Sequence, residues 1–249
     1  MTSPARPTLA ILQARMSSTR LPGKVLLRVC GKPLLAHQVE RVRRAKRIDE
    51  LVVATSTDSS DDPLQALCES IGVRCHRGSL DDVLDRFIGA AKDFEPGYVV
   101  RLTGDCPLAD PQVIDKVIAA AQEPGVDYAS NALHPTYPDG LDVECMRYEV
   151  LQQAAREARK PSEREHVTPF IHTQPQRFAL RDVKNDVDLS HLRWTVDEPA
   201  DFVFVSQVFD WMYPTKPAFD MNDVLDFERS HPEIARINRK IERNAGYTP

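Results

Sequence analysis

The chain of 249 residues lacks the features that mark several protein classes. Its apolar runs stay well short of the roughly 20 residues that cross a membrane, so we expect no membrane partner. The N-terminal segment MTSPARPTLA has no long apolar core of the signal-peptide type, which predicts a cytoplasmic protein. The five cysteines are odd in number and never spaced as C-x-x-C, which favours reduced thiols over a disulfide framework.

Positively charged residues are also fewer than negatively charged residues over the whole chain. Lys and Arg number 32 against 37 for Asp and Glu, so the formal net charge is −5. This balance argues against a nucleic-acid partner or a protein of the membrane surface. A single loop that holds Arg15, Arg20 and Lys24 therefore needs a local explanation.

The first half of the chain alternates apolar, β-branched segments with helical periodicities. Strands are predicted over residues 8–13, 51–55, 73–76 and 98–102, with amphipathic helices between them. This alternation is typical of βαβ units, in which helices cover both faces of a mainly parallel sheet. We therefore predict a three-layer α/β fold.

The chain changes character after residue 130, at SNALHPTYPDGLDVECM. We predict an excursion from the sheet over 131–190, with helices over 148–159 and near 163–171. Strands are expected around 178–183 and at LRWTVD, residues 192–197, and a helix begins at Glu198 and Pro199. Residues 1–249 then form a single domain, with 131–190 inserted and 212–249 as a charged helical tail.

The cation-containing loop follows the first predicted strand, in the segment ARMSSTRLPGK. Ligands of parallel sheets collect at the carboxyl ends of the strands. Backbone amides beside Ser17, Ser18 and Thr19 can ring a polyphosphate, while Arg15 offers a bidentate fork and Lys24 a point charge. The loop is not a Walker A motif, because no Ser or Thr follows its Gly-Lys pair. Alternatively, its charges are solvated and its Pro-Gly pair is an ordinary turn.

Two aspartates follow other predicted strands. Asp105 lies in RLTGDCPLADP and Asp197 in RWTVDEPADF. Singly, the first could form a turn and the second could cap a helix. Beside a cationic phosphate loop, the two carboxylates together are what a Mg²⁺ that bridges nucleotide phosphates requires. We therefore predict a shared metal ion at Asp105 and Asp197.

A resemblance to a known family rests on six segments in this order: ILQARMSSTRLPGKVLLRVCGKPLL, VVATSTDSSDD, VVRLTGDCPLADP, GLDVE, EREHVTPFI and RWTVDEPADF. Together they resemble the cytidylyltransferase family that includes the CMP-Kdo and CMP-acylneuraminate synthetases, and most of all its spore-coat-polysaccharide branch. The resemblance spans about residues 8–210. It implies a nucleotidyltransferase fold with a dimerisation excursion, and hence a homodimer. It also implies transfer of CMP from CTP to an acidic sugar or related acceptor, with release of pyrophosphate.

The resemblance also implies roles for individual residues. By position, Asp105 and Asp197 would bind Mg²⁺. The residues that would bind or approach CTP are Ala14, Arg15, Ser18, Lys24 and Thr103. In such a reaction an acceptor oxygen attacks the α-phosphorus in line, and negative charge builds on the departing pyrophosphate. Arg15, Lys24 and the metal at Asp105 would neutralise that charge and form the predicted catalytic set.

The excursion supplies candidates for acceptor binding. Asp142 and Glu144 point to the same side of an alternating strand. Arg164 could pair with an acceptor carboxylate or phosphate, and His166 could donate to a sugar oxygen. The alternatives are an exposed acidic turn and a helix with ordinary surface charges. Arg77, after the strand at 73–76, could face the nucleotide.

Two other functions stay open. A glycosyltransferase that uses a nucleotide-sugar predicts a D-x-D metal motif, and DVD at 186–188 has these letters but lies away from the phosphate loop. A catalytically silent nucleotide-binding protein predicts loss of one of the four charged site residues. Arg15, Lys24, Asp105 and Asp197 are all present.

Overall fold

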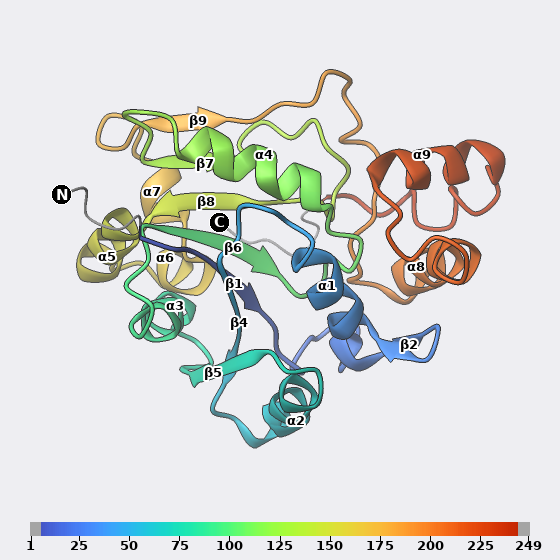
Figure 1. The fold of residues 1–249 in the computed structure, drawn as a ribbon, viewed down its shortest axis with the longest axis horizontal. Helices are drawn as coiled ribbons and strands as arrows, with labels where there is room; N and C mark the ends of the chain where they lie inside the picture. The colour runs from blue at the N-terminus through green and yellow to red at the C-terminus, as the bar shows by residue number, and fades with distance from the viewer. Residues whose placement is uncertain (1–5, 244–249) are drawn as a thin grey trace.

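A computed structural model describes residues 6–243 of the chain. Its main sheet has seven strands in the order β5-β4-β1-β6-β8-β7-β9, which spread across the middle of the molecule in Figure 1. The strands are β1 (Thr8–Gln13), β4 (Glu50–Ser56), β5 (Arg74–Gly78), β6 (Tyr98–Thr103), β7 (Tyr128–Ser130), β8 (Glu144–Arg147) and β9 (Leu180–Asp182). A small hairpin pairs β2 (Arg28–Val29) with β3 (Lys32–Pro33).

Parallel pairing dominates the first half of the chain. β1 lies between β4 and β6 and is parallel to both, and β4 is parallel to β5. β8 pairs antiparallel with β6 and β7, and β9 is parallel to β7. The strands predicted over 8–13, 51–55, 73–76 and 98–102 are all present, so the prediction of a mainly parallel α/β sheet is confirmed.

Helices cover both faces of the sheet. The helices are α1 (Leu34–Val42), α2 (Asp62–Ser70), α3 (Val83–Ala91), α4 (Pro111–Ala121), α5 (Tyr148–Glu157), α6 (Pro161–His166), α7 (Pro169–His172), α8 (Pro199–Met212) and α9 (Met221–Ser230). Along β1, Leu9 and Ile11 pack with α3, α5 and α7, whereas Ala10 and Leu12 pack with α1, α4 and α8. A central parallel strand is buried on both faces, which is why LAIL, residues 9–12, reads as an unbroken apolar run.

The segment 131–190 differs from the prediction in two respects. It was expected to leave the sheet, but β8 and β9 belong to the sheet, and β8 lies between β6 and β7. The helix expected near 163–171 is split into α6 and α7. Val167 interrupts it, since this fully buried residue has a positive φ of 72°.

The strand predicted over 192–197 is wrong. Within the described chain, this segment makes a single β-bridge, between Arg193 and Asp139. Its apolar residues Trp194 and Val196 are fully buried. Arg193 and Thr195 between them are also buried, at 6% and 5% exposure, so the alternation of apolar and polar residues arises in an extended segment that is buried on all sides and has no partner strand.

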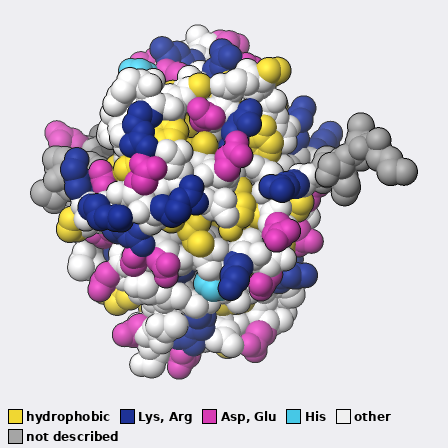
Figure 2. All heavy atoms as spheres, turned by 90° about the vertical axis from the view of Figure 1, so that its left-hand side faces the viewer, with side chains coloured by type: hydrophobic (Ala, Val, Ile, Leu, Met, Phe, Trp, Pro, Cys, Tyr) yellow, Lys and Arg dark blue, Asp and Glu magenta, His cyan; other side chains and the backbone are white. Residues whose placement is uncertain are grey.

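The C-terminal part is less helical than predicted. α9 ends at Ser230, and residues 231–243 form turns, while residues 244–249 lie outside the described part. α8 and α9 lie together at one end of the molecule, on the right in Figure 1. On the face that carries α5, Figure 2 shows Lys and Arg side chains interspersed with Asp and Glu side chains. No helix among residues 6–243 is long and apolar enough to cross a membrane.

Candidate active site

A cavity of about 740 Å³ lies where the predicted site residues meet. It is lined by the loops that follow β1 and β6, by residues of α3, α6 and α7, and by the segment before α8. The predicted residues that line it are Ala14, Arg15, Ser18, Lys24, Thr103, Asp105, Asp142, Glu144, His166 and Asp197. The structure thus brings together side chains that are up to 183 positions apart, from position 14 to position 197.

Lys24 lies between the two predicted metal-binding carboxylates. Its Nζ is 2.7 Å from Asp197 Oδ1 and 3.5 Å from Asp105 Oδ2. Burial alone would lower the pKa of Lys24, but the Asp105 and Asp197 carboxylates raise it above its usual value. The pKa of Asp105 is lowered despite burial, because Lys24 and a hydrogen bond from Thr103 favour the carboxylate. Both partners are therefore charged at neutral pH.

Backbone contacts hold these two aspartates close without a strand at 192–197. The amide of Val196 donates to the Asp105 carbonyl oxygen at 2.8 Å, and Thr195 Oγ1 donates to the same oxygen at 3.2 Å. Arg20, from the loop that follows β1, pairs with Asp197 at 2.9 Å. Three segments far apart in sequence are thereby joined at one point.

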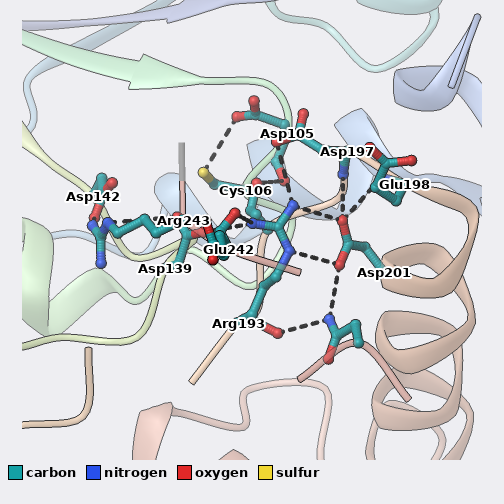
Figure 3. A network of polar contacts seen from close by, with 12 residues as sticks. Asp105, Cys106, Asp139, Asp142, Arg193, Asp197, Glu198, Asp201, Glu242 and Arg243 are labelled. Atoms are coloured by element: carbon teal, nitrogen blue, oxygen red, sulfur yellow. Dashed lines mark hydrogen bonds and ion pairs between the residues drawn. The ribbon is translucent and has the colours of Figure 1, made fainter. Parts of the chain in front are cut away.

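A buried network fixes the segment that carries Asp197 (Figure 3). Asp201, which is fully buried, accepts two hydrogen bonds of 2.9 Å from Arg193 and also binds the amides of Asp197 and Glu198. Burial would raise the pKa of Asp201, but Arg193 and these amides lower it. Arg193 also donates to Asp139 at 2.9 Å. Sequence reasoning missed this network, although Arg193 and Asp201 lie within the RWTVDEPADF segment.

The carboxylate pair fits a magnesium ion that is bound together with substrate. Among residues 6–243, no group of three or more His, Cys, Asp or Glu side chains could hold a metal ion. Asp105 and Asp197 nevertheless converge on one cation, the Lys24 ammonium. Mg²⁺ commonly uses one or two carboxylates and takes its remaining ligands from phosphates and water. The donor set therefore suits Mg²⁺ with a nucleotide, and does not suit a metal held by protein alone.

The acidic residues predicted to bind the acceptor already have protein partners. Glu144 accepts hydrogen bonds from Tyr128 at 2.5 Å and Thr168 at 2.6 Å, and it pairs with Arg101. Asp142 accepts a hydrogen bond from Arg243, in the C-terminal segment, at 2.5 Å (Figure 3). These contacts hold Glu144 and Asp142 in the wall of the cavity.

His166 also lines the cavity. Burial lowers the pKa of His166, and the nearby cations Arg101 and Arg15 lower it further, while Glu165 opposes them. The same burial effect lowers the pKa of His172, which also lines the cavity. Both imidazoles are therefore neutral at pH 7.

Arg77 and Arg164 do not line the cavity among the described residues. Arg77 pairs with Asp62 at 2.6 Å and donates to the Ser56 and Asp58 carbonyl oxygens. Arg164 pairs with Asp82 and so ties α6 to the start of α3. These structural contacts occupy both guanidinium groups.

Comparison with known proteins agrees with this geometry. A family model described as cytidylyltransferase matches residues 9–207. The chain is 34% identical over 236 residues to the spore coat polysaccharide biosynthesis protein SpsF of Bacillus subtilis, which covers 91% of this chain and 96% of that protein. It is 36% identical over 140 residues to a 3-deoxy-manno-octulosonate cytidylyltransferase of Anaeromyxobacter sp. (strain Fw109-5), which covers 55% of each chain. A solved cytidylyltransferase from Leptospira borgpetersenii superposes with a TM-score of 0.89 at 29% identity, over 95% of this chain and 99% of the other.

Proposed function

Because the chain belongs to the cytidylyltransferase family, we propose that it transfers CMP from CTP to an acidic sugar or a related acceptor, with Mg²⁺ as cofactor and release of pyrophosphate. The observation that carries the proposal is the Lys24 ammonium between Asp105 and Asp197 in the main cavity. This cluster combines a phosphate-binding cation with a carboxylate pair that suits a nucleotide-bound metal.

The roles of the residues follow from charge. When bound by Asp105 and Asp197, Mg²⁺ would supply a Lewis acid that neutralises phosphate charge. Lys24 and Arg15 bind oxygens of the departing pyrophosphate, where negative charge develops. The acceptor oxygen attacks the α-phosphorus in line, and the protein contributes position and electrostatics without a covalent intermediate.

The acceptor side of the proposal rests on His166, which lines the cavity. His166, neutral at pH 7, can accept a proton from an acceptor hydroxyl or hydrogen-bond a sugar oxygen. One relative is named for 3-deoxy-manno-octulosonate and another for spore coat polysaccharide. These names support an acidic sugar as acceptor and a role in surface glycan synthesis. The homodimer and the cytoplasmic location stay predictions.

A pyrophosphate-release assay tests the proposal. The purified protein is incubated with Mg²⁺, with each nucleoside triphosphate in turn and with pools of sugar acids, phosphosugars and phosphonates. We expect release only with CTP, only with one acceptor pool, and none when EDTA replaces Mg²⁺. Release of pyrophosphate from another nucleoside triphosphate would contradict the proposed specificity for CTP. Failure of CTP to bind would contradict the proposal as a whole.

No structural observation favours the rival glycosyltransferase. Asp186 and Asp188 of the DVD segment are exposed and do not line the cavity. Asp188 accepts a hydrogen bond from the Ser190 amide, which is an ordinary turn contact. The D-x-D letters therefore have no place in the candidate site.

A further inference from the structure

The main cavity contains an arginine that the proposed reaction does not yet use. Arg86, in α3, lines the cavity and is only 2% exposed. Its Nη1 donates to the Ser79 carbonyl oxygen at 3.0 Å, while its Nε is buried without a hydrogen-bond partner. Within residues 6–243 it forms no ion pair. A buried guanidinium is costly unless its charge and its donors are matched, so this side chain needs a partner.

Other buried arginines show what a matched guanidinium looks like in this fold. Arg193 pairs with Asp201 and Asp139. Arg41 is matched in part: it donates to the Ala109 and Leu108 carbonyl oxygens and its guanidinium lies 4.2 Å from the centre of the Phe219 ring, while its Nη1 is buried without a hydrogen-bond partner. Arg41 does not line the cavity. Arg86 combines burial, an unmatched donor and access to the cavity.

A second guanidinium increases the need for an anion at this place. Arg15 also lines the cavity, is exposed, and makes no hydrogen bond or ion pair within the described chain. Burial and the charge of Arg15 lower the pKa of Arg86 to about 10, so Arg86 remains charged at neutral pH. The nearby Asp61 carboxylate opposes this effect, but it is engaged by the Met16 amide and by Ser56.

The end of β5 provides the space for Arg86. A Cβ on Gly78 would lie 3.0 Å from Arg86 Cγ and 3.1 Å from Arg86 Cβ. Glycine at position 78 therefore lets the arginine stem pack against the strand. The side chain is held by α3 and by β5, two regular elements, so its position is defined before any ligand arrives.

We propose that Arg86 and Arg15 together form an oxyanion site that binds a phosphate or carboxylate group of a substrate in this cavity. An oxyanion near both guanidinium groups would relieve their mutual repulsion and accept the hydrogen bonds that Arg86 lacks. The inference rests on the proposed function only for the identity of the substrate. The group is a phosphate of the nucleotide or the acidic group of the acceptor, and the experiment separates these two sources.

The first measurement is binding of pyrophosphate and of CTP, each with Mg²⁺, by isothermal titration calorimetry. The variants are Arg86→Met and Arg86→Lys, with Arg41→Met as the control for loss of a buried arginine outside the cavity. Hydrogen bonds to charged groups predict that Arg86→Met weakens binding of the oxyanion about 10- to 100-fold. Arg86→Lys keeps the charge, so its affinity for the oxyanion should fall less than that of Arg86→Met. Arg41→Met should bind pyrophosphate and CTP with the affinity of the wild type.

Thermal unfolding supplies a second readout that does not depend on activity. Because Arg86→Met removes an unmatched buried cation, its melting temperature without ligand should equal or exceed that of the wild type. The rise in melting temperature that the bound oxyanion causes in the wild type should be reduced in the variant. A melting temperature lowered as much as in Arg41→Met, with unchanged ligand binding, would show that Arg86 is structural and overturn the inference.

The outcomes separate the two sources and the two proposals. Weaker binding of CTP and pyrophosphate assigns the oxyanion to the nucleotide. Unchanged CTP binding, with the acceptor KM raised about tenfold, assigns it to the acceptor. If neither the binding of CTP and pyrophosphate nor the acceptor KM changes while CTP is still turned over, the inference fails and the proposed function stands. Arg86-dependent anion binding by a protein that does not turn over CTP would support the site and contradict the proposed function.

Discussion

At the scale of single residues, Lys24 is the most sharply testable side chain. Its ammonium is 2.7 Å from Asp197 and 3.5 Å from Asp105. Lys24→Met removes a cation that can bind the outer phosphates, so we expect kcat/KM for CTP to fall about 100-fold or more. Affinity for CTP should fall more than affinity for CMP. Steady-state kinetics and calorimetry check both expectations.

The control for this substitution is Lys32→Met. Lys32 also pairs with a carboxylate, Glu40 at 2.9 Å, but it lies outside the cavity. Its kcat/KM should match that of the wild type. Equal losses of CTP and CMP affinity in Lys24→Met would mean that Lys24 does not reach the outer phosphates.

The sequence predicts which residues reach the cavity where that depends on their position relative to the end of a strand. The resemblance to cytidylyltransferases is confirmed, and with it a CTP-dependent nucleotidyltransferase. Residues after β1 and β6 reach the cavity because parallel strands end at one edge of the sheet. The direction of a long side chain is not encoded so simply. Arg77 turns toward Asp62, and Arg86 reads in the sequence as an ordinary charge of an amphipathic helix.

At the scale of elements, the loop that carries Asp139 and Asp142 is held by a close backbone contact. Gly140 has a φ of +108°, and a Cβ there would lie 2.5 Å from the Thr195 amide nitrogen and 2.6 Å from the Trp194 carbonyl carbon. Sequence patterns cannot show this contact, because it joins a turn to a segment that resembles a strand but lacks a partner. The strand predicted at 192–197 was incorrect, and the Arg193 network was missed, because both depend on contacts between segments that are far apart in the sequence.

Gly140→Ala should therefore destabilise the protein. The positive φ alone costs about 1–3 kcal/mol, and the backbone clash adds to it. The control is Gly125→Ala, which has a φ of +79° but nothing within 4 Å of the new Cβ. Urea unfolding should show a clearly larger loss for Gly140→Ala than for Gly125→Ala. Equal losses would mean that the loop moves away from residues 194 and 195 without penalty.

The C-terminal segment contributes a second element-scale prediction. Arg243 donates to Asp142 at 2.5 Å in the cavity wall. In Arg243→Ala the Asp142 carboxylate loses this cation and repels an anionic acceptor, so the acceptor KM should rise several-fold while the CTP KM stays constant. Adding Asp142→Asn removes the repelling charge and should restore the acceptor KM. Arg229→Ala, in an exposed pair with Asp226, is the control.

A failure of Asp142→Asn to restore the acceptor KM would place the effect elsewhere. Arg243 also lies 3.9 Å from Asp139 and 3.4 Å from the Tyr137 carbonyl oxygen. Loss of these contacts would loosen the segment and lower the melting temperature. A change in the melting temperature without a change in the acceptor KM would therefore contradict an electrostatic role for Arg243.

At the scale of the whole molecule, the cavity is lined by carboxylates that repel one another. Asp105, Asp139, Asp142 and Asp197 all line it. Burial raises the pKa of Asp139 to about 6, and Asp142 and Asp105 raise it while Arg243 and Arg193 oppose them. The net charge of −5 does not reveal this concentration of charge. Folding must therefore hold like charges together, and the stability of the protein should depend on pH.

The direction of this pH dependence follows from the linkage between proton binding and folding. A carboxyl group whose pKa is higher in the folded than in the unfolded state stabilises the fold at pH below about 4, and this contribution is lost as the pH rises through about 6. Asp139→Asn lacks the titration, so its free energy of unfolding should gain about 2–3 kcal/mol relative to the wild type between pH 4 and pH 7. Urea unfolding across this range, with the exposed Asp226→Asn as control, measures the difference. A wild type that gains stability over the same range relative to Asp139→Asn would show that the 2.9 Å pair with Arg193 dominates and keeps Asp139 ionised.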